Sequence, residues 1–479
     1  MTSTTSIISH KFLAHYLAAL LRTSVRFSLL AIIFLIPLAA LAQIDAQTGL
    51  QSAVQNPLPP IENAESIRLP ADFDRVNFYL ITVDVGNALW NNFGHTALRV
   101  VDEESNTDLI FNWGLFDTSV GYVTFAANFL RGVMVYELGV SPPGWELRTY
   151  EHEQRTVWQE RINLNRVQKE TLYKRLAWNL REENITYNYH YFFDNCTTRV
   201  RDYLNEALQG EIAAQHQSPV PATFRDEALA YYASLPPIVL SLDVLLNSSV
   251  DRQMTEWEHM FLPLQLRNKL MDHPSSSYEN GQRLNLLDDS LFLMQYAPPT
   301  SYMNVYYYVA LLLLVPLLYL LFNLRRNSIS SLTSSPDYTL KVPGVNFRLL
   351  GLAGLIIALV SGIFGFMMVF GWWFSDHQVM YHNINLLLFW PTDIFAVVMA
   401  ARWLIFAQAI QISTSRYTLI SFYLLGHVLA ALVYIVAGIT GLVDQQLNSL
   451  IIVVVPVLLM FTTLVWSAGL HPIRNIRFK

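Results

Sequence analysis

The chain contains a single cysteine, Cys196, in the segment YFFDNCTTRVRDYL. A thiol is a nucleophile only as the thiolate, so its surroundings decide whether it reacts. The residues after Cys196 predict a helix, because apolar side chains recur from Val200 at spacings of three and four. If Asp194 or Asn195 caps this helix, Cys196 lies in the first turn, where the helix dipole favours a thiolate. A cysteine packed on the apolar face of the helix is the alternative that this segment leaves open.

A cysteine nucleophile needs a base, and the base needs a third group that orients it. His95 follows a glycine at the start of a predicted strand, where its imidazole would stand at the end of a sheet. Asn112, in the next predicted strand, could hold the imidazole in one tautomer. Asp117 is the alternative orienting group and His190 the alternative base. The sequence therefore predicts a site of Cys196, His95 and Asn112, with no metal and no cofactor.

These residues belong to a predicted α+β domain that spans residues 44–300. Dense β-branched and aromatic residues predict five strands, at 76–86, 95–101, 107–116, 132–140 and 155–164. Apolar residues at helical spacing predict helices at 166–184 and from Cys196 to Gly210. For residues 220–300 we expect short helices and loops.

The composition changes near residue 300. Only 14% of the 479 residues are charged, against a usual share of about 25%. Only four of the 37 acidic residues lie beyond residue 300. We therefore predict that residues 301–479 form an all-α transmembrane domain with five helices, at about 303–323, 348–372, 386–407, 418–442 and 449–468. No basic patch indicates a nucleic-acid partner.

The N-terminus predicts export of the chain. Basic residues precede an apolar run that ends in Ala40-Leu41-Ala42, so residues 1–42 are predicted to be a signal peptide. An uncleaved anchor is the alternative, and both place the following residues outside the cytoplasm. Loops with Lys and Arg alternate with loops that lack them along the C-terminal half, which puts the α+β domain and the 373–385 loop on one extracytoplasmic side. In a bacterium this is the periplasmic face of the inner membrane.

Three strings in the chain resemble a known family. FGHTALRV, NWGLF and YFFDNCTTRVRD, followed by membrane spans and the block DHQVMYHNINLLLFWP, are similar to the Lnb-type bacterial lipoprotein N-acyltransferases. The resemblance implies a circularly permuted papain-like domain, in which the histidine precedes the cysteine along the chain. It also implies that Cys196 accepts the acyl group and that His95 is its base, with Asn112 as the third member.

The resemblance further implies the substrates. The acyl donor would be a membrane phospholipid, and the acceptor the α-amino group of the diacylglyceryl-cysteine at the N-terminus of a lipoprotein. Arg199 is a candidate for binding a lipid phosphate, although exposed arginines on helices are more often solvated. His377, Asn383 and Asn385 lie in the extracytoplasmic loop and are candidates for binding headgroups or the amine. Their alternative role is to cap helix ends.

Two other classes of function remain open from the sequence. The same residues could serve a membrane-bound lipid hydrolase or a cell-wall peptidase of the permuted papain kind. A non-enzymatic envelope protein with a structural cysteine is the third class. The number of spans argues against a peptidase, for which one anchor suffices.

Overall fold

The structure is a computed structural model of the 479-residue chain. It describes residues 58–61, 65, 68–116, 122–279, 282–301, 305–332, 344–406 and 419–469. All of these residues belong to one compact unit, Ser52–Lys479. The predicted signal peptide and Asp117 lie outside the described residues.

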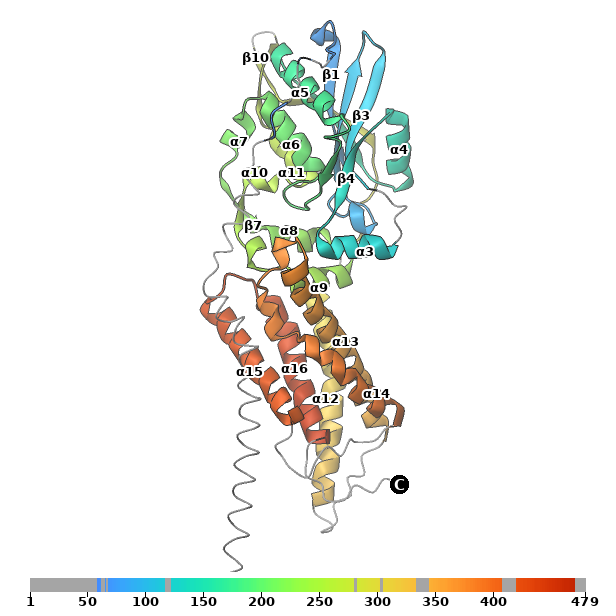
Figure 1. The fold of residues 1–479 in the computed structure, drawn as a ribbon, viewed down its shortest axis with the longest axis vertical. Helices are drawn as coiled ribbons and strands as arrows, with labels where there is room; N and C mark the ends of the chain where they lie inside the picture. Colours follow the sequence, from blue (N-terminus) through green and yellow to red (C-terminus); the bar gives the residue numbers. More distant parts are fainter. Residues whose placement is uncertain are drawn as a thin grey trace, which may run out of the picture. The chain divides into compact units, whose positions relative to one another are not determined.

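The α+β part is built on one seven-stranded antiparallel sheet with the order β11-β5-β1-β2-β3-β4-β6 (Figure 1). All five predicted strands are confirmed. The bounds are β1 Val76–Val83, β2 His95–Asp102, β3 Thr107–Leu115, β4 Val135–Ser141, β5 Val157–Ile162, β6 Thr186–Asn188 and β11 Leu287–Met294. Strand β11 corrects the expectation of helices and loops in residues 220–300. Its sequence LDDSLFLM lacks regular alternation, and its exposed acidic residues suit only an edge strand.

Helices cover both faces of this sheet. Helices α5 (Arg166–Asn179) and α6 (Cys196–Ala207) pack on one face, and α4 (Pro143–His152) packs on the other (Figure 1). The buried indole N–H of Trp113 in β3 and the hydroxyl of Tyr203 in α6 both donate to Asn179 Oδ1. Helix α5 ends at Asn179, five residues before the predicted end, because Asn184 folds back and donates to the carbonyl of Trp178.

Smaller elements complete the α+β part. Two hairpins pair β7 with β8 and β9 with β10. The remaining bounds are η2 Phe73–Arg75, η3 Leu89–Asn91, α3 Tyr122–Arg131, α7 Glu211–Gln215, β7 Pro219–Thr223, α8 Phe224–Tyr231, α9 Pro236–Leu245, η5 Ser248–Val250, β8 Gln253–Thr255, α10 Glu256–His259, α11 Pro263–Met271, β9 Pro274–Glu279 and β10 Gln282–Asn285.

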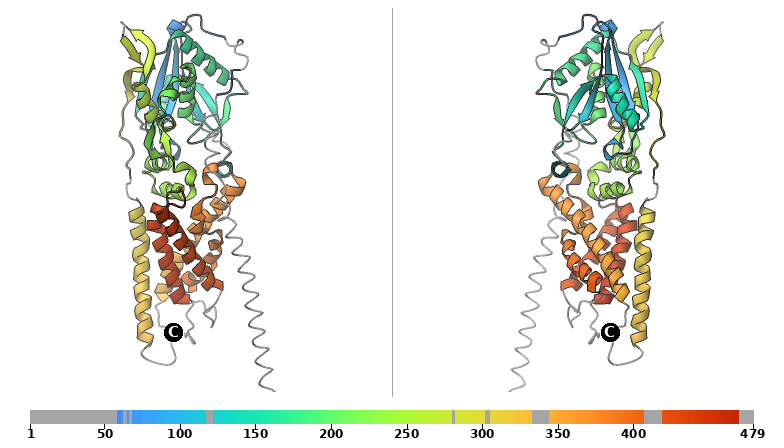
Figure 2. Two further views of the ribbon diagram at one scale, coloured as in Figure 1. Left: turned by 90° about the vertical axis from the view of Figure 1, so that its left-hand side faces the viewer. Right: turned by 90° about the vertical axis from the view of Figure 1, so that its right-hand side faces the viewer.

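The C-terminal part is helical. Its helices are α12 Val305–Leu332, α13 Gly344–Phe374, α14 Ala396–Phe406, α15 Leu419–Thr440 and α16 Asn448–Gly469, and α12 stands beside α16 (Figure 2). Among the described residues, three helices are long and apolar enough to cross a membrane, or up to four if a bent pair is one span. Helix α12 adds a shorter apolar stretch, Tyr308–Asn323. The count of five spans therefore stays a prediction.

The predicted helix at 386–407 is not continuous. Short 3-10 helices, η6 (Gln378–Met380), η7 (Ile384–Leu387) and η8 (Pro391–Phe395), precede α14, and the two halves of the apolar segment meet at 63°. Pro391 cannot continue a helix from the preceding turn. Asp393 holds the break in place by accepting bonds from Ser361 Oγ at 2.5 Å, Tyr423 Oη at 2.6 Å and His427 Nε2 at 3.0 Å.

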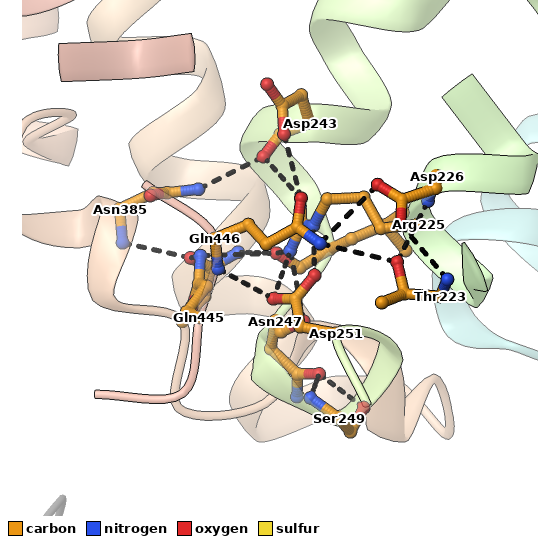
Figure 3. Close-up of polar contacts among 12 residues, drawn as sticks. Thr223, Arg225, Asp226, Asp243, Asn247, Ser249, Asp251, Asn385, Gln445 and Gln446 are labelled. Carbon is orange, nitrogen blue, oxygen red and sulfur yellow. Dashed lines mark hydrogen bonds and ion pairs between the residues drawn. The ribbon is translucent and has the colours of Figure 1, made fainter. Parts of the chain in front are cut away.

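A buried polar cluster joins the two parts (Figure 3). Arg225 of α8 donates to Asp251 Oδ1 at 2.5 Å and to Asp243 Oδ1 at 3.0 Å, and its remaining N–H groups reach carbonyls of residues 243, 246 and 247. The backbone N–H of Gln446, between α15 and α16, donates to Asp251 Oδ2 at 3.0 Å. The side chains of all three charged residues are at most 2% exposed.

Candidate active site

Cys196 is the first residue of helix α6. Asn195 is the N-cap, because its Oδ1 accepts from the backbone N–H groups of Thr197 at 2.9 Å and Thr198 at 2.8 Å. Of the two predicted caps, Asn195 is therefore the one observed. Asp194 instead forms a bidentate ion pair with Arg199, at 2.5 and 2.7 Å. Cys196 thus has the predicted position in the first turn, where the helix dipole stabilises a thiolate.

His95 is the first residue of β2 and pairs with Val83 of β1. The preceding Gly94 has a φ of +81°, and a Cβ there would lie 2.6 Å from the carbonyl oxygen of Val83. Only glycine fits this turn, which aims the chain so that His95 stands at the end of the sheet. The expectation for the position of His95 is confirmed.

Asn112 of β3 contacts the imidazole directly. His95 Nε2 lies 2.6 Å from Asn112 Oδ1, while Asn112 Nδ2 donates to Glu146 Oε2 at 3.0 Å. Because a carboxylate only accepts, the amide must face Glu146 with its nitrogen and His95 with its oxygen. Nε2 of His95 then carries the proton, and Nδ1 is the nitrogen left for the thiol of Cys196.

The sheet register brings the cysteine to this histidine. The pairing of β2 with β3 ends at Leu98 and Phe111, and His95 and Gly114 each lie three residues beyond that end, in β2 and β3 respectively. A Cβ on Gly114 would lie 4.0 Å from the Cβ of Cys196, with no other atom within that distance. The glycine therefore leaves open space between β3 and the helix start. The hydroxyls of Thr96 and Thr197, 3.1 Å apart, link β2 to α6 beside the pair.

The electrostatics of the pair favour an ionised thiol. Burial raises the pKa of Cys196, but the charge of His95 and hydrogen bonds from His95, the Thr96 backbone and Thr197 outweigh it and lower the pKa to about 7. For His95, burial lowers the pKa, and the interaction with Cys196 more than offsets this, so the pKa is raised. A thiolate–imidazolium pair of this kind is the reactive form of cysteine nucleophiles.

Alkylation of Cys196 by iodoacetamide is expected to accelerate through a midpoint near pH 7, below the ordinary thiol value of 9.0, because the thiolate is the reacting form and it accumulates above the lowered pKa. Mass spectrometry of the single labelled cysteine gives the rate at each pH. In His95→Gln the burial remains and the charge of His95 is lost, so the midpoint is expected to move upward. An unchanged midpoint in that variant would contradict the pairing.

Glu146 is a residue of this site that the sequence analysis missed. Its two oxygens accept from Asn112 Nδ2 at 3.0 Å and from Ser141 Oγ at 2.7 Å. It therefore fixes the amide of Asn112, which in turn orients His95. The sequence could have predicted the helix that carries Glu146, but not its contact with Asn112. The pair Pro142-Pro143 is typical of a helix N-terminus, and Glu146 follows in the first turn of α4.

His190, the alternative base, and Arg199, the candidate for binding a lipid phosphate, each have other partners. His190 accepts the backbone N–H of Phe192 on its Nδ1, and burial, with a smaller contribution from His377, lowers its pKa to about 4. It is held in the neutral form by its surroundings. The guanidinium of Arg199 is occupied by Asp194 and lies 4.2 Å from the centre of the Tyr187 ring. The structure gives no support to a phosphate site at Arg199.

The loop after α13 contacts the α+β part next to the site. The backbone N–H of Asp376 donates to the carbonyl of Arg131 at 2.9 Å, and His377 lies against Gly132. Asn383 and Asn385, however, are buried, and their amides donate to the carbonyls of residues 243, 244 and 246. The prediction that these two asparagines bind substrate therefore finds no support, because their polar groups hold the end of α9.

Two family models match the chain. The model described as the Lnb N-terminal periplasmic domain matches residues 64–228, which include His95, Asn112 and Cys196. The model described as the Lnb transmembrane domain matches residues 345–468. None of the curated proteins and none of the solved structures compared with the chain matches it. The chain is a membrane protein with a sheet-rich periplasmic domain followed by a helical transmembrane region.

Proposed function

Because the chain belongs to the Lnb family, we propose that it transfers an acyl chain from a membrane phospholipid to the N-terminus of a diacylated lipoprotein. The reaction that we infer runs in the bacterial inner membrane, at its periplasmic face. The fold that we infer for the periplasmic domain is circularly permuted papain-like, with the base strand β2 ahead of the nucleophile helix α6. Cys196 is the proposed nucleophile, His95 its base and Asn112 the orienting group.

In the first half of the proposed reaction, the Cys196 thiolate attacks the carbonyl carbon of a phospholipid ester. The bond to the glycerol oxygen breaks, His95 gives that oxygen its proton, and a lysophospholipid leaves. In the second half, the α-amine of diacylglyceryl-cysteine attacks the thioester, and His95 takes the proton from the amine. The amide forms, the carbon–sulfur bond breaks, and the thiolate is restored.

The observation that carries this proposal is the distance between the site and the membrane region. Strand β4 starts three residues after Gly132, and a Cβ on Gly132 would lie 2.9 Å from the backbone nitrogen of His377. Gly114 lies between the β3 residues that pair with Glu137 and Leu138, so the site stands five or six residues beyond Gly132, which corresponds to at most roughly 20 Å. A nucleophile within about 20 Å of the end of a span suits a substrate whose headgroup stays at the membrane surface.

Burial of the site supports transfer over hydrolysis. Cys196 is 9% exposed and the neighbouring Thr197 is fully buried. A thioester at this buried position is poorly accessible to water, so its hydrolysis is slow and it persists until the amine attacks. The aromatic side chains of Tyr187 and Tyr189 lie close enough to the sulfur to interact electrostatically with it.

The test is reconstitution of the full chain in phospholipid vesicles with a synthetic diacylglyceryl-cysteine peptide. We expect mass spectrometry to detect a triacylated peptide and an equal amount of lysophospholipid. A vesicle lipid with acyl chains absent from the peptide identifies the donor. Release of free fatty acid with no acylated peptide would show a hydrolase instead, and the absence of both products would remove the proposal.

A further inference from the structure

The connection between β1 and β2 carries an exposed apolar pair just ahead of His95. Leu89 is 46% and Trp90 is 69% exposed, although both lie in the ordered helix η3. The two residues that follow, Asn91 and Asn92, are buried. The stretch from Val85 to Gly94 contains no charged residue. Two large apolar side chains are therefore presented side by side on an uncharged turn, which we call the Leu89–Trp90 turn.

Hydrogen bonds and aromatic packing hold this turn in position on the protein. Asn92 Nδ2 donates to the carbonyl of Ala88 at 2.8 Å, and Ser234 Oγ donates to Asn92 Oδ1 at 3.1 Å. The ring of Phe93 lies 5.3 Å from that of Tyr232 and 5.9 Å from that of Phe261. The exposure of Trp90 is thus built into the turn.

The anchor of the turn includes the start of a membrane-region helix. Phe93 packs in one apolar cluster with Tyr306 and Val309 of α12 and with residues of α9. Tyr308, in the same first turn of α12, is 71% exposed, and aromatic side chains of this kind gather at membrane–water interfaces. Trp90 precedes Phe93 by three residues, which places it within roughly 10 Å of Phe93.

We propose that the Leu89–Trp90 turn is a lipid-contact surface that dips into the headgroup layer of the outer leaflet, beside the Cys196 site. An indole with an adjacent leucine on an uncharged turn suits that layer, because the ring buries its apolar body and keeps its N–H among polar groups. Trp90 precedes His95 by five residues along the chain. The turn then disorders the lipids of the leaflet at the point where a donor phospholipid must leave it. This last step alone rests on the proposed function.

Fluorescence quenching tests the contact without any catalytic activity. In a Cys196→Ala background the chain has no other cysteine, so Trp90→Cys can be labelled with an environment-sensitive fluorophore and placed in nanodiscs. Trp145→Cys is the matched control, because Trp145 is also 69% exposed. It lies in the first turn of α4, after β4 has run roughly 20 Å away from the Gly132 loop.

We expect a phospholipid with a nitroxide near the top of its acyl chain to quench the label at position 90 several-fold more than the label at 145. Equal quenching at the two positions overturns the proposal. Disulfide formation between two copies of the unlabelled Trp90→Cys variant under an added oxidant, together with no quenching of the label, would assign the turn to a protein interface and also overturn the proposal. Neither result depends on whether Cys196 is a nucleophile.

A second experiment tests delivery of the donor. With Cys196 intact, the double variant Leu89→Ser/Trp90→Ser is expected to slow acylation of Cys196 by vesicle phospholipid about tenfold more than acylation by a soluble short-chain ester. An equal loss with both esters would point to a disturbed site and would overturn the delivery role. If neither ester acylates the wild-type Cys196, the proposed function fails, while the quenching result still decides the lipid contact.

Discussion

Replacement of Cys196 by alanine is expected to lower the rate of acyl transfer to the lipopeptide by at least about a thousandfold. The reason is that the proposed route has no other group to carry the acyl chain, since the chain contains no second thiol. His95 remains in Cys196→Ala but has nothing to activate. The measurement is the initial rate of triacyl peptide formation in vesicles, compared with that of the wild type.

Cys196→Ser distinguishes the covalent route from direct attack of the amine on the phospholipid. A serine at the start of α6 can take the acyl group as an oxygen ester, which amines attack far more slowly than a thioester. We expect the mass of the Cys196→Ser variant to rise by one acyl chain while product formation stays low. Hydroxylamine at neutral pH should release the acyl group from the wild type and leave the variant acylated. Product formed by Cys196→Ala at the wild-type rate would refute the nucleophile assignment.

Replacement of Arg225 by alanine is expected to destabilise the protein by about 3–5 kcal/mol, because it leaves buried carboxylates without a counter-charge. The side chains of Asp243 and Asp251 are 2% and 1% exposed, and Arg225 donates to both. It also satisfies three carbonyl groups between α9 and η5. Thermal unfolding in detergent, followed by circular dichroism, measures the change.

Arg75→Ala is the matched control for that loss. Its ion pair with Asp72 spans 3.9 Å, and the side chain is 60% exposed, so its removal should cost at most about 1 kcal/mol. Arg225→Lys keeps the charge but cannot reach two carboxylates and three carbonyls at once, so its stability should fall between wild type and alanine. Similar unfolding midpoints for Arg225→Ala and Arg75→Ala would contradict a structural role for the cluster.

The parts of the site that could be predicted from the sequence depend on short-range patterns. The strand of His95 and the helix of Cys196 follow from local periodicity, and Asn112 lies in the strand that follows that of His95 along the chain. Because consecutive strands usually pair, the contact between His95 and Asn112 could be predicted from the sequence. The position of Cys196 in the first turn likewise follows from a capping residue one position earlier.

Glu146, Asn383 and Asn385 could not be assigned in this way, because their partners are distant in sequence. Glu146 meets Asn112 across 34 residues, and Asn385 meets the carbonyl of Val244 across 141. A polar residue in a loop has the same local pattern whether it contacts a substrate or a main-chain carbonyl. The break before α14 could not be predicted for another reason. Hydropathy is averaged over a window of residues, and the apolar residues around Pro391 and Asp393 keep that average high although the helix changes direction there.

The wide separation of His95 and Cys196 along the chain has a consequence for when the thiol of Cys196 becomes reactive. The hydroxyl contact of Thr96 with Thr197 joins residues 101 positions apart, and β3, β4, β5 and α5 lie between them. Contacts of such long range close late in folding. While the exported chain is still folding, its thiol lacks both the imidazole and the helix terminus that lower its pKa. The thiol therefore acquires its lowered pKa only when the sheet is complete, and a half-folded chain carries an ordinary, weakly reactive cysteine.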